Sequence, residues 1–117
     1  MPPARKKGGN HMKKTMYKLT YYPTDRFGSV TGAEIAYFPD LEDALSEMRV
    51  QRSCRYRAIL HDGPVEIVIE DKCLYGTRVF VEIAYDGGKV AYYTEPWTAQ
   101  RCGRYGKLDT FAMVREA

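Results

Sequence analysis

Several short stretches of the chain alternate between apolar and polar residues with a period of two, a pattern typical of strands that bury one face. The alternating stretches are 17–22, 54–61, 65–71, 77–85 and 89–94. Residues 34–38 form a shorter extended piece. Residues 97–109 show neither strand nor helix periodicity, so we expect an irregular segment there, followed by a weak strand or helical turn over 110–114.

Two turn sequences divide these stretches into hairpins. Asp62-Gly63 separates 54–61 from 65–71, and a turn centred there would place Leu60 opposite Val65 and Arg55 opposite Glu70. The second turn sequence, Asp86-Gly87-Gly88, joins 77–85 to 89–94. The sequence therefore predicts an antiparallel meander over the middle of the chain.

One helix is predicted over residues 40–52. Its apolar residues follow helical spacing: Leu41, Ala44, Leu45 and Met48. Asp40 is a candidate N-cap, and arginines lie in the last turn, where the helix dipole favours cations. We therefore predict a single-domain α+β fold, β-α-β-β-β-β, in which one helix packs on one face of an antiparallel sheet of about five strands.

The charge of the chain is uneven. Five of the 18 basic residues lie in residues 1–14, which contain no acidic residue, so 13 basic and 15 acidic residues remain in 15–117. With two prolines and two glycines and no apolar periodicity, residues 1–14 are expected to be a disordered basic tail. The His11-Met12 junction after Gly-Gly-Asn is typical of an expression-vector remnant, so part of this tail need not be native.

The cysteines and hydropathy predict a reducing, cytoplasmic location. Cys54, Cys73 and Cys102 are widely spaced and form no C-x-x-C motif, which favours neither a disulfide framework nor a zinc site. The apolar runs are too short to cross a membrane. No metal, cofactor or membrane association is expected.

Catalytic motifs are weak throughout. His61 and Asp62 lie in the predicted turn without further metal ligands, and Cys54 and His61 are expected on opposite faces of one strand. Glu66 and Glu70 alternate with core residues and share their face with arginines, which lower rather than raise a carboxyl pKa. We therefore expect a protein that is not an enzyme.

Arginine and aromatic residues share the polar face of the predicted meander. The candidate partner-binding residues are Arg55, Arg57, Arg78, Phe80 and Tyr93. Arginine and aromatic side chains are enriched at protein interfaces. This composition favours a protein partner.

The segment 101–107 combines two glycines with cationic and aromatic residues. Its candidate anion-binding residues are Arg101, Arg104, Tyr105 and Lys107. Glycine lets the backbone approach a phosphate, and a tyrosine ring can stack on a base. It is not a Walker A loop, because Leu108 follows the lysine where serine or threonine is required.

Two hypotheses follow. The first is a small non-enzymatic binding or regulatory protein that acts through a macromolecular partner, above all another protein. Accessory or inhibitor proteins of phages and mobile elements are a common example of this kind. The alternative is a nucleic-acid-binding protein that uses the basic tail and the 101–107 segment. An unpaired strand at 17–22 would also offer an edge for a partner strand or a homodimer.

Overall fold

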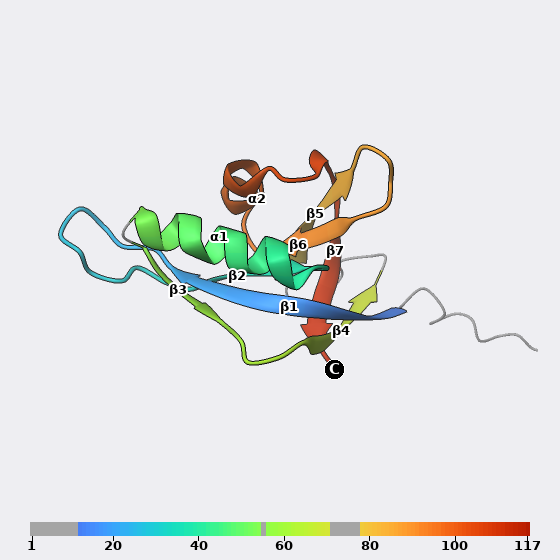
Figure 1. Cartoon of the computed structure of the whole chain (residues 1–117), viewed down its shortest axis with the longest axis horizontal. Helices are drawn as coiled ribbons and strands as arrows, with labels where there is room; N and C mark the ends of the chain where they lie inside the picture. The colour runs from blue at the N-terminus through green and yellow to red at the C-terminus, as the bar shows by residue number, and fades with distance from the viewer. Residues whose placement is uncertain (1–11, 55, 71–77) are drawn as a thin grey trace, which may run out of the picture.

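The strands of the computed structural model form one antiparallel sheet that closes into a barrel (Figure 1). The structure describes residues 12–54, 56–70 and 78–117. Within these residues the elements are β1 (Met12–Tyr22), β2 (Glu34–Phe38), α1 (Leu41–Ser53), β3 (Arg57–Leu60), β4 (Val65–Glu70), β5 (Arg78–Ala84), β6 (Val90–Tyr93), α2 (Pro96–Cys102) and β7 (Gly106–Glu116). The α+β class and the single domain agree with the prediction. The described residues form seven strands and two helices, more than the prediction of about five strands and one helix.

Closure of the sheet depends on the length of β1. The strand order is β2-β6-β5-β7-β4-β1-β3, and β2 also pairs with β1, so six strands form a ring and β3 lies outside it. The 11 residues of β1 are long enough to pair with β2 on one edge and with β4 and then β3 on the other. Closing the ring removes the free edges of these six strands over their paired lengths.

Two hydrophobic layers result from the alternation of side chains along the ring strands. The barrel interior contains residues from all six ring strands: Met16, Tyr37, Ile67, Ile69, Val79, Tyr92, Ala112 and Val114. The helix-side layer lies between the barrel wall and the two helices: Leu19, Tyr21, Ala36, Phe38, Ala44, Ala58, Ala91, Tyr93, Ala99 and Tyr105. Strands β2 and β6 therefore contribute buried residues to both layers.

The predicted hairpin at Asp62-Gly63 is wrong. Strands β3 and β4 both pair with β1, so the chain keeps its direction through this dipeptide. Leu60 lies opposite Leu19 and Val65 opposite Met16, so residues 61–64 face only residues 17 and 18. Gly63 supplies the positive φ of 77° that this bulge uses. An Asp-Gly dipeptide is compatible with a bulge as well as with a hairpin turn. The bulge forms here because the long strand β1 pairs with both β3 and β4.

The predicted second hairpin is confirmed. In the β5–β6 pair, Val81 lies opposite Tyr92 and Ile83 opposite Val90. The Ala84 N–H donates to the Lys89 carbonyl at 2.8 Å, and Gly87 has a φ of 76° in the turn. Of its predicted apolar face, Val79 and Tyr92 pack in the barrel interior with Val81 and Val90 partly buried beside them, whereas Tyr85 is 88% exposed. Its other face, expected to be exposed, is partly covered by the helix-side layer.

Helix α1 forms where it was predicted, but only part of its predicted apolar stripe is buried. Asp40 is the N-cap residue without a side-chain cap bond, and its carboxylate pairs with Lys89 Nζ at 2.7 Å. The buried residues are Ala44, Glu47 and Gln51, whereas Leu41 is 42% exposed. Cys54, expected at the start of the 54–61 strand, is instead the exposed residue that ends the helix. Burial of Glu47 and Gln51 costs little because they bond to each other and to Arg104 and Arg101, respectively.

The segment predicted to be irregular contains α2 and the start of β7. Pro96 lies in the first turn of α2, where its missing N–H costs nothing, and Gly103 ends the helix with a left-handed φ of 44°. Strand β7 is longer than the predicted 110–114 segment and completes the ring between β5 and β4. A seven-residue helix is too short to give a periodic pattern that can be read from sequence.

The predicted tail overlaps the first strand. Residues 12–14 belong to β1 and pair with β4, whereas residues 1–11 lie outside the described residues. Strand β1 is paired along both edges, so 17–22 is not the open edge that was predicted. Among the described residues, neither helix has the length and apolar character needed to span a bilayer.

Candidate functional site

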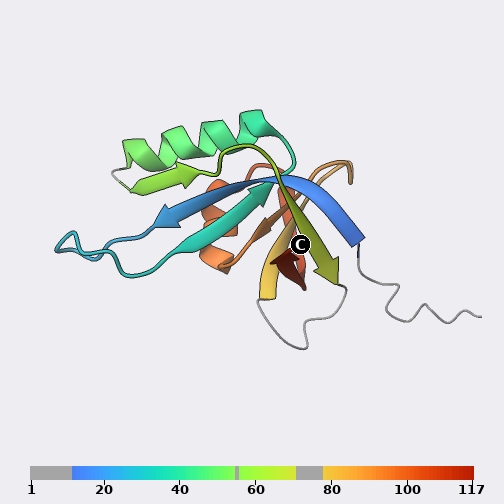
Figure 2. The same cartoon turned by 90° about the horizontal axis from the view of Figure 1, so that it is seen from below.

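Strands β3, β1 and β2 form a three-stranded region whose two faces differ. Helix α1 packs against all three strands on one face, as Figures 1 and 2 show. Side chains alternate along each strand, so the neighbours of the residues in the helix-side layer point the other way. We call this second side the open face, and its residues are Lys18, Thr20, Tyr22, Ile35, Arg57 and Ile59.

The centre of the open face is a cross-strand row. Thr20 lies opposite Ile35 on β2 and opposite Ile59 on β3. Ile59 is 41% exposed, although a β-branched apolar side chain in a strand is usually buried. In the next row the Arg57 guanidinium lies 5.4 Å from the centre of the Tyr22 ring, a cation–π geometry. The open face thus presents apolar, aromatic and cationic groups side by side.

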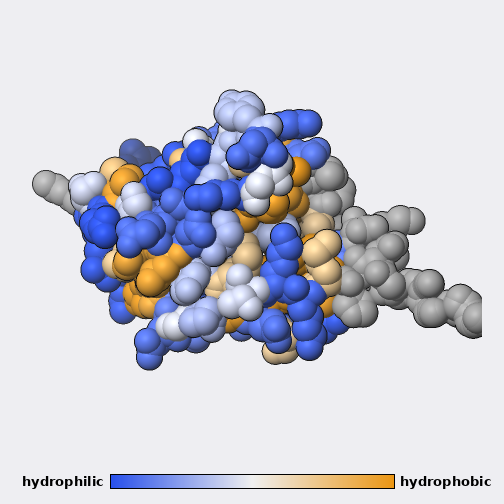
Figure 3. Space-filling view, turned by 45° about the vertical axis from the view of Figure 1, so that its right-hand side comes forward, coloured by the Kyte–Doolittle hydropathy of each residue, from blue (hydrophilic) through white to orange (hydrophobic). Residues whose placement is uncertain are grey.

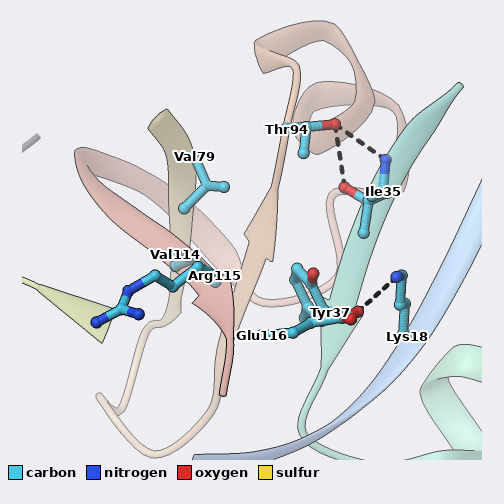
Figure 4. Close-up of a pocket in the computed structure, with 8 residues that line it drawn as sticks. All are labelled: Lys18, Ile35, Tyr37, Val79, Thr94, Val114, Arg115 and Glu116. Carbon is cyan, nitrogen blue, oxygen red and sulfur yellow. Dashed lines mark hydrogen bonds and ion pairs between the residues drawn. The ribbon is translucent and has the colours of Figure 1, made fainter. Parts of the chain in front are cut away.

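The open face leads into the mouth of the barrel. A cavity of about 280 Å³ opens there, lined by Lys18, Ile35, Tyr37, Val79, Thr94, Val114, Arg115 and Glu116 (Figure 4). Ile35, Val79 and Val114 supply an apolar wall from three different strands. Because Lys18 and Ile35 belong to both features, the open face and the cavity form one continuous surface.

Charged side chains at the mouth are paired. Lys18 donates from its ammonium group to Glu116, and this ion pair joins β1 to β7. Arg115 lies 3.7 Å from a Glu70 carboxylate oxygen, and its side chain points away from the cavity in Figure 4. Burial, together with the negative charge of Glu116, raises the pKa of Tyr37 to about 12. The Tyr37 hydroxyl is therefore neutral at physiological pH.

The loop between β1 and β2 extends past the end of α1 (Figure 1). Phe27 at its tip is 82% exposed, and Arg26 lies 5.6 Å from the Phe27 ring centre. Asp25 holds the tip by accepting hydrogen bonds from the N–H groups of Phe27 and Ser29, at 2.8 and 3.0 Å. Gly28 adopts a φ of 85° there. The loop thus presents an aromatic side chain on a preorganised turn.

The predicted partner-binding residues do not form one face. Arg57 is exposed on β3, but Arg78 and Phe80 lie on β5, which neighbours β6 and β7 instead. Tyr93 is completely buried and donates its hydroxyl to Glu82 at 2.8 Å. Arg55 lies outside the described residues. The open face therefore retains only Arg57 from the predicted set.

The predicted anion-binding residues mostly serve the packing of the two helices. Arg104 donates to Ser46 at 2.9 Å and lies 3.6 Å from Glu47. Tyr105 is 8% exposed and donates its hydroxyl to Asp43. Arg101 stacks 4.9 Å from the Tyr56 ring centre and bonds to Gln51, and Lys107 is exposed on β7. These side chains do not converge on an anion site.

A buried thiol lies under α2. Cys102 Sγ is 3.3 Å from the Tyr21 hydroxyl, within the layer that also contains Glu47. Burial, with a smaller contribution from the negative charge of Glu47, raises the pKa of the Cys102 thiol well above its usual range. A thiol held protonated is a poor nucleophile. In the described part of the chain, no three or more His, Cys, Asp or Glu residues are grouped to hold a metal.

Strand β3 is the edge of the sheet, and α1 protects it. The His61 N–H donates to the Lys18 carbonyl, so the alternation of the ladder turns the Ala58 carbonyl away from β1. Arg52 caps that carbonyl with two hydrogen bonds, at 3.2 and 3.1 Å. A capped acceptor is not available to another strand.

Removing this cap tests the edge. We expect Arg52→Ala to increase self-association, because the freed Ala58 carbonyl can then accept a bond from a second β3. Sedimentation equilibrium over a range of concentrations measures the effect, with Arg49→Ala on the exposed side of α1 as the control. Equal association constants for the two variants would contradict the protective role of Arg52.

Most of this surface escaped the sequence analysis. Lys18, Thr20 and Tyr37 lie on predicted extended segments, but nothing local indicates that these two segments pair with each other or that β3 pairs with the other edge of β1. The face drawn in Figure 3 is largely hydrophilic, with apolar side chains in small separate groups.

No protein-family profile matches the chain, and comparisons with curated proteins and with solved structures likewise find no match.

Proposed function

We propose that this chain is a non-enzymatic binding protein that engages another protein through its open face. The observation that carries the proposal is the uncovered side of the β3–β1–β2 region, where Ile59 is 41% exposed beside the Arg57–Tyr22 pair. Both helices pack on the opposite side of the barrel wall. An arginine, an aromatic ring and an exposed β-branched residue together have the composition of an interface centre.

Charge indicates the kind of partner. The open face carries Arg57 and Lys18, and Arg26 lies at the tip of the neighbouring loop. Lys18 is neutralised by Glu116, whereas Asp25 is occupied by backbone N–H groups of its own loop. An acidic partner segment with apolar residues would match this surface, since complementary charge steers association and selects the partner.

A nucleic-acid partner is the less supported alternative. In the 101–107 segment, Arg104 and Tyr105 are bonded to side chains of α1. Releasing them for phosphate contacts would remove bonds that hold α1 on the barrel. The open face, in contrast, can accept a partner without breaking the fold.

The β1–β2 loop is a natural second contact for the same partner. Phe27 is exposed on a turn that Asp25 already holds in place, so little conformational entropy is lost when it becomes buried. Its position beyond the end of α1 places it at the far end of the sheet from the barrel mouth. A partner that covers the open face could reach both features.

The experiment compares two double variants with matched charge changes. Arg57→Glu with Ile59→Glu alters the open face, and Arg49→Glu with Val50→Glu alters the exposed side of α1. A partner captured from the native host is purified, and its affinity for each variant is measured by calorimetry. We expect the open-face variant to lose about 2 kcal/mol or more, roughly thirtyfold in Kd, and the control to bind as the wild type does.

Two results would overturn the proposal. Equal loss of affinity in both double variants would indicate a general charge effect rather than a site. Capture that disappears on nuclease treatment, with binding that falls steeply as salt rises, would favour the nucleic-acid alternative. Circular dichroism of each variant checks that the fold is intact.

A further inference from the structure

The cavity at the barrel mouth has the size and lining of a pocket for one side chain. Its volume is about 280 Å³, and Ile35, Val79 and Val114 form its apolar wall (Figure 4). An apolar cavity of about 150 Å³ in another protein is large enough to bind benzene. This cavity therefore has room for a phenyl ring or a branched aliphatic side chain.

The charged groups and the threonine around the cavity are already paired within the chain. Lys18 bonds to Glu116, and Arg115 lies beside Glu70. Thr94 Oγ accepts a hydrogen bond from the Ile35 N–H at 2.9 Å and donates to the Ile35 carbonyl at 3.3 Å. A charged ligand would have to compete with these pairs. An apolar group would contact only the apolar wall of the cavity and would leave the pairs intact.

The position of the cavity says how its occupant arrives. Ile35 is the end of the Ile35–Thr20–Ile59 row and also lines the cavity, next to the Lys18 and Tyr37 pair on β1 and β2. A segment lying across that row reaches the mouth without leaving the surface. Its flanking residues then approach Arg57, which favours acidic neighbours.

We propose that the barrel mouth receives a single bulky apolar side chain, of leucine, isoleucine or phenylalanine, from an extended segment of the partner protein with acidic flanking residues. This inference rests on the proposed function and assigns its anchor. The buried side chain supplies the desolvated centre of the interface, and the open face supplies the surrounding contacts. The Lys18–Glu116 pair stays in place at the rim.

The pocket can be tested without the partner by using toluene, the analogue of a phenylalanine side chain. Titration of the 15N-labelled protein should give saturable amide shifts centred on Ile35, Tyr37, Val79 and Val114. Val114→Phe fills the pocket and should abolish them. Ile35→Trp provides a second filling variant at a position that is only half-buried, in case Val114→Phe does not fold. Val50→Phe on the exposed side of α1 is the control and should leave the shifts unchanged.

The partner then separates this inference from the proposed function. We expect the folded pocket-filling variants to bind the partner at least tenfold more weakly than the Val50→Phe control. If Arg57→Glu with Ile59→Glu abolishes binding while both filling variants bind like wild type, the anchor is wrong and the proposed function stands. If neither set of changes affects binding, both are wrong. Toluene shifts that persist unchanged in the folded filling variants would also overturn the pocket.

Discussion

Replacing Glu82 with alanine is expected to destabilise the protein strongly. Glu82 is 2% exposed, and its carboxylate accepts three hydrogen bonds. The donors are the Tyr93 hydroxyl at 2.8 Å and the N–H groups of Tyr105 and Gly106 at 3.0 and 3.2 Å. These bonds join β5 to β6 and to the start of β7.

The expected loss is about 3–5 kcal/mol, because two buried donors and one partly buried donor lose their acceptor at once. This is a large share of the 5–15 kcal/mol that typically separates folded from unfolded domains. Urea denaturation followed by circular dichroism measures the change. A midpoint equal to that of the wild type would show that Glu82 does not support this corner of the barrel.

Two further substitutions distinguish the loss of the Glu82 hydrogen bonds from the general effect of removing a carboxylate. Glu82→Gln keeps the shape and one oxygen acceptor, so we expect a smaller loss, about 1–2 kcal/mol. Glu66→Ala removes an exposed carboxylate from β4 and should change stability by less than about 0.5 kcal/mol. The order Glu82→Ala, Glu82→Gln, Glu66→Ala is the expected result.

Alkaline pH is expected to unfold the protein cooperatively. Burial is the main cause that raises the pKa of five tyrosines above the ordinary value of 10.0. They are Tyr21, Tyr37, Tyr92, Tyr93 and Tyr105. For Tyr37, burial and the nearby Glu116 raise the pKa to about 12.

The direction of the effect follows from linkage. The folded state holds the proton more tightly than the unfolded state, so this contribution to stability is fully present below about pH 10, the ordinary tyrosine pKa. It is lost as the pH rises through the folded-state pKa values, about 12 for Tyr37. Each unit of pKa difference contributes about 1.4 kcal/mol, and five groups act together. Ultraviolet absorbance of tyrosinate and circular dichroism should therefore change at the same pH.

Tyr92→Phe tests this explanation. Burial alone raises the pKa of Tyr92, so removing its hydroxyl removes one titrating group and leaves the barrel interior otherwise filled. We expect the alkaline transition to shift to higher pH than in the wild type. Tyrosine ionisation that precedes loss of structure by more than about one pH unit would contradict the proposed coupling.

Where a pattern depends on local chemistry, the sequence analysis agrees with the structure. The helix near 40–52 and the hairpin at Asp86-Gly87 depend on residues a few positions apart, and both are present. The bulge at Asp62-Gly63 shows the limit, because positive φ at Gly63 serves either a reversal or a bulge. Only the available edge of β1 selects the bulge.

The candidate site depended on long-range pairing. Arg57 is predicted from sequence as an interface residue and lies on the open face, but Tyr93 from the same predicted set is buried under the helices. An aromatic residue on the predicted polar face of a strand has the same sequence pattern whether or not a helix covers that face. Arg104 and Tyr105 resemble loop residues in the sequence because their partners Ser46 and Asp43 lie far away in the chain.

By itself, the sequence determined the α+β class, the position of α1, the β5–β6 hairpin and the apolar face that this hairpin turns to the core. Each of these depends on periodicity or turn chemistry within a short window. Only the tertiary structure decided that the sheet closes into a barrel, that β2 and β6 contribute buried residues to both layers, and that β3, β1 and β2 leave a face open beside the barrel mouth. The reason is physical: strand partners and helix coverage depend on contacts between distant segments, and the free energy of those contacts has no signature in any one segment.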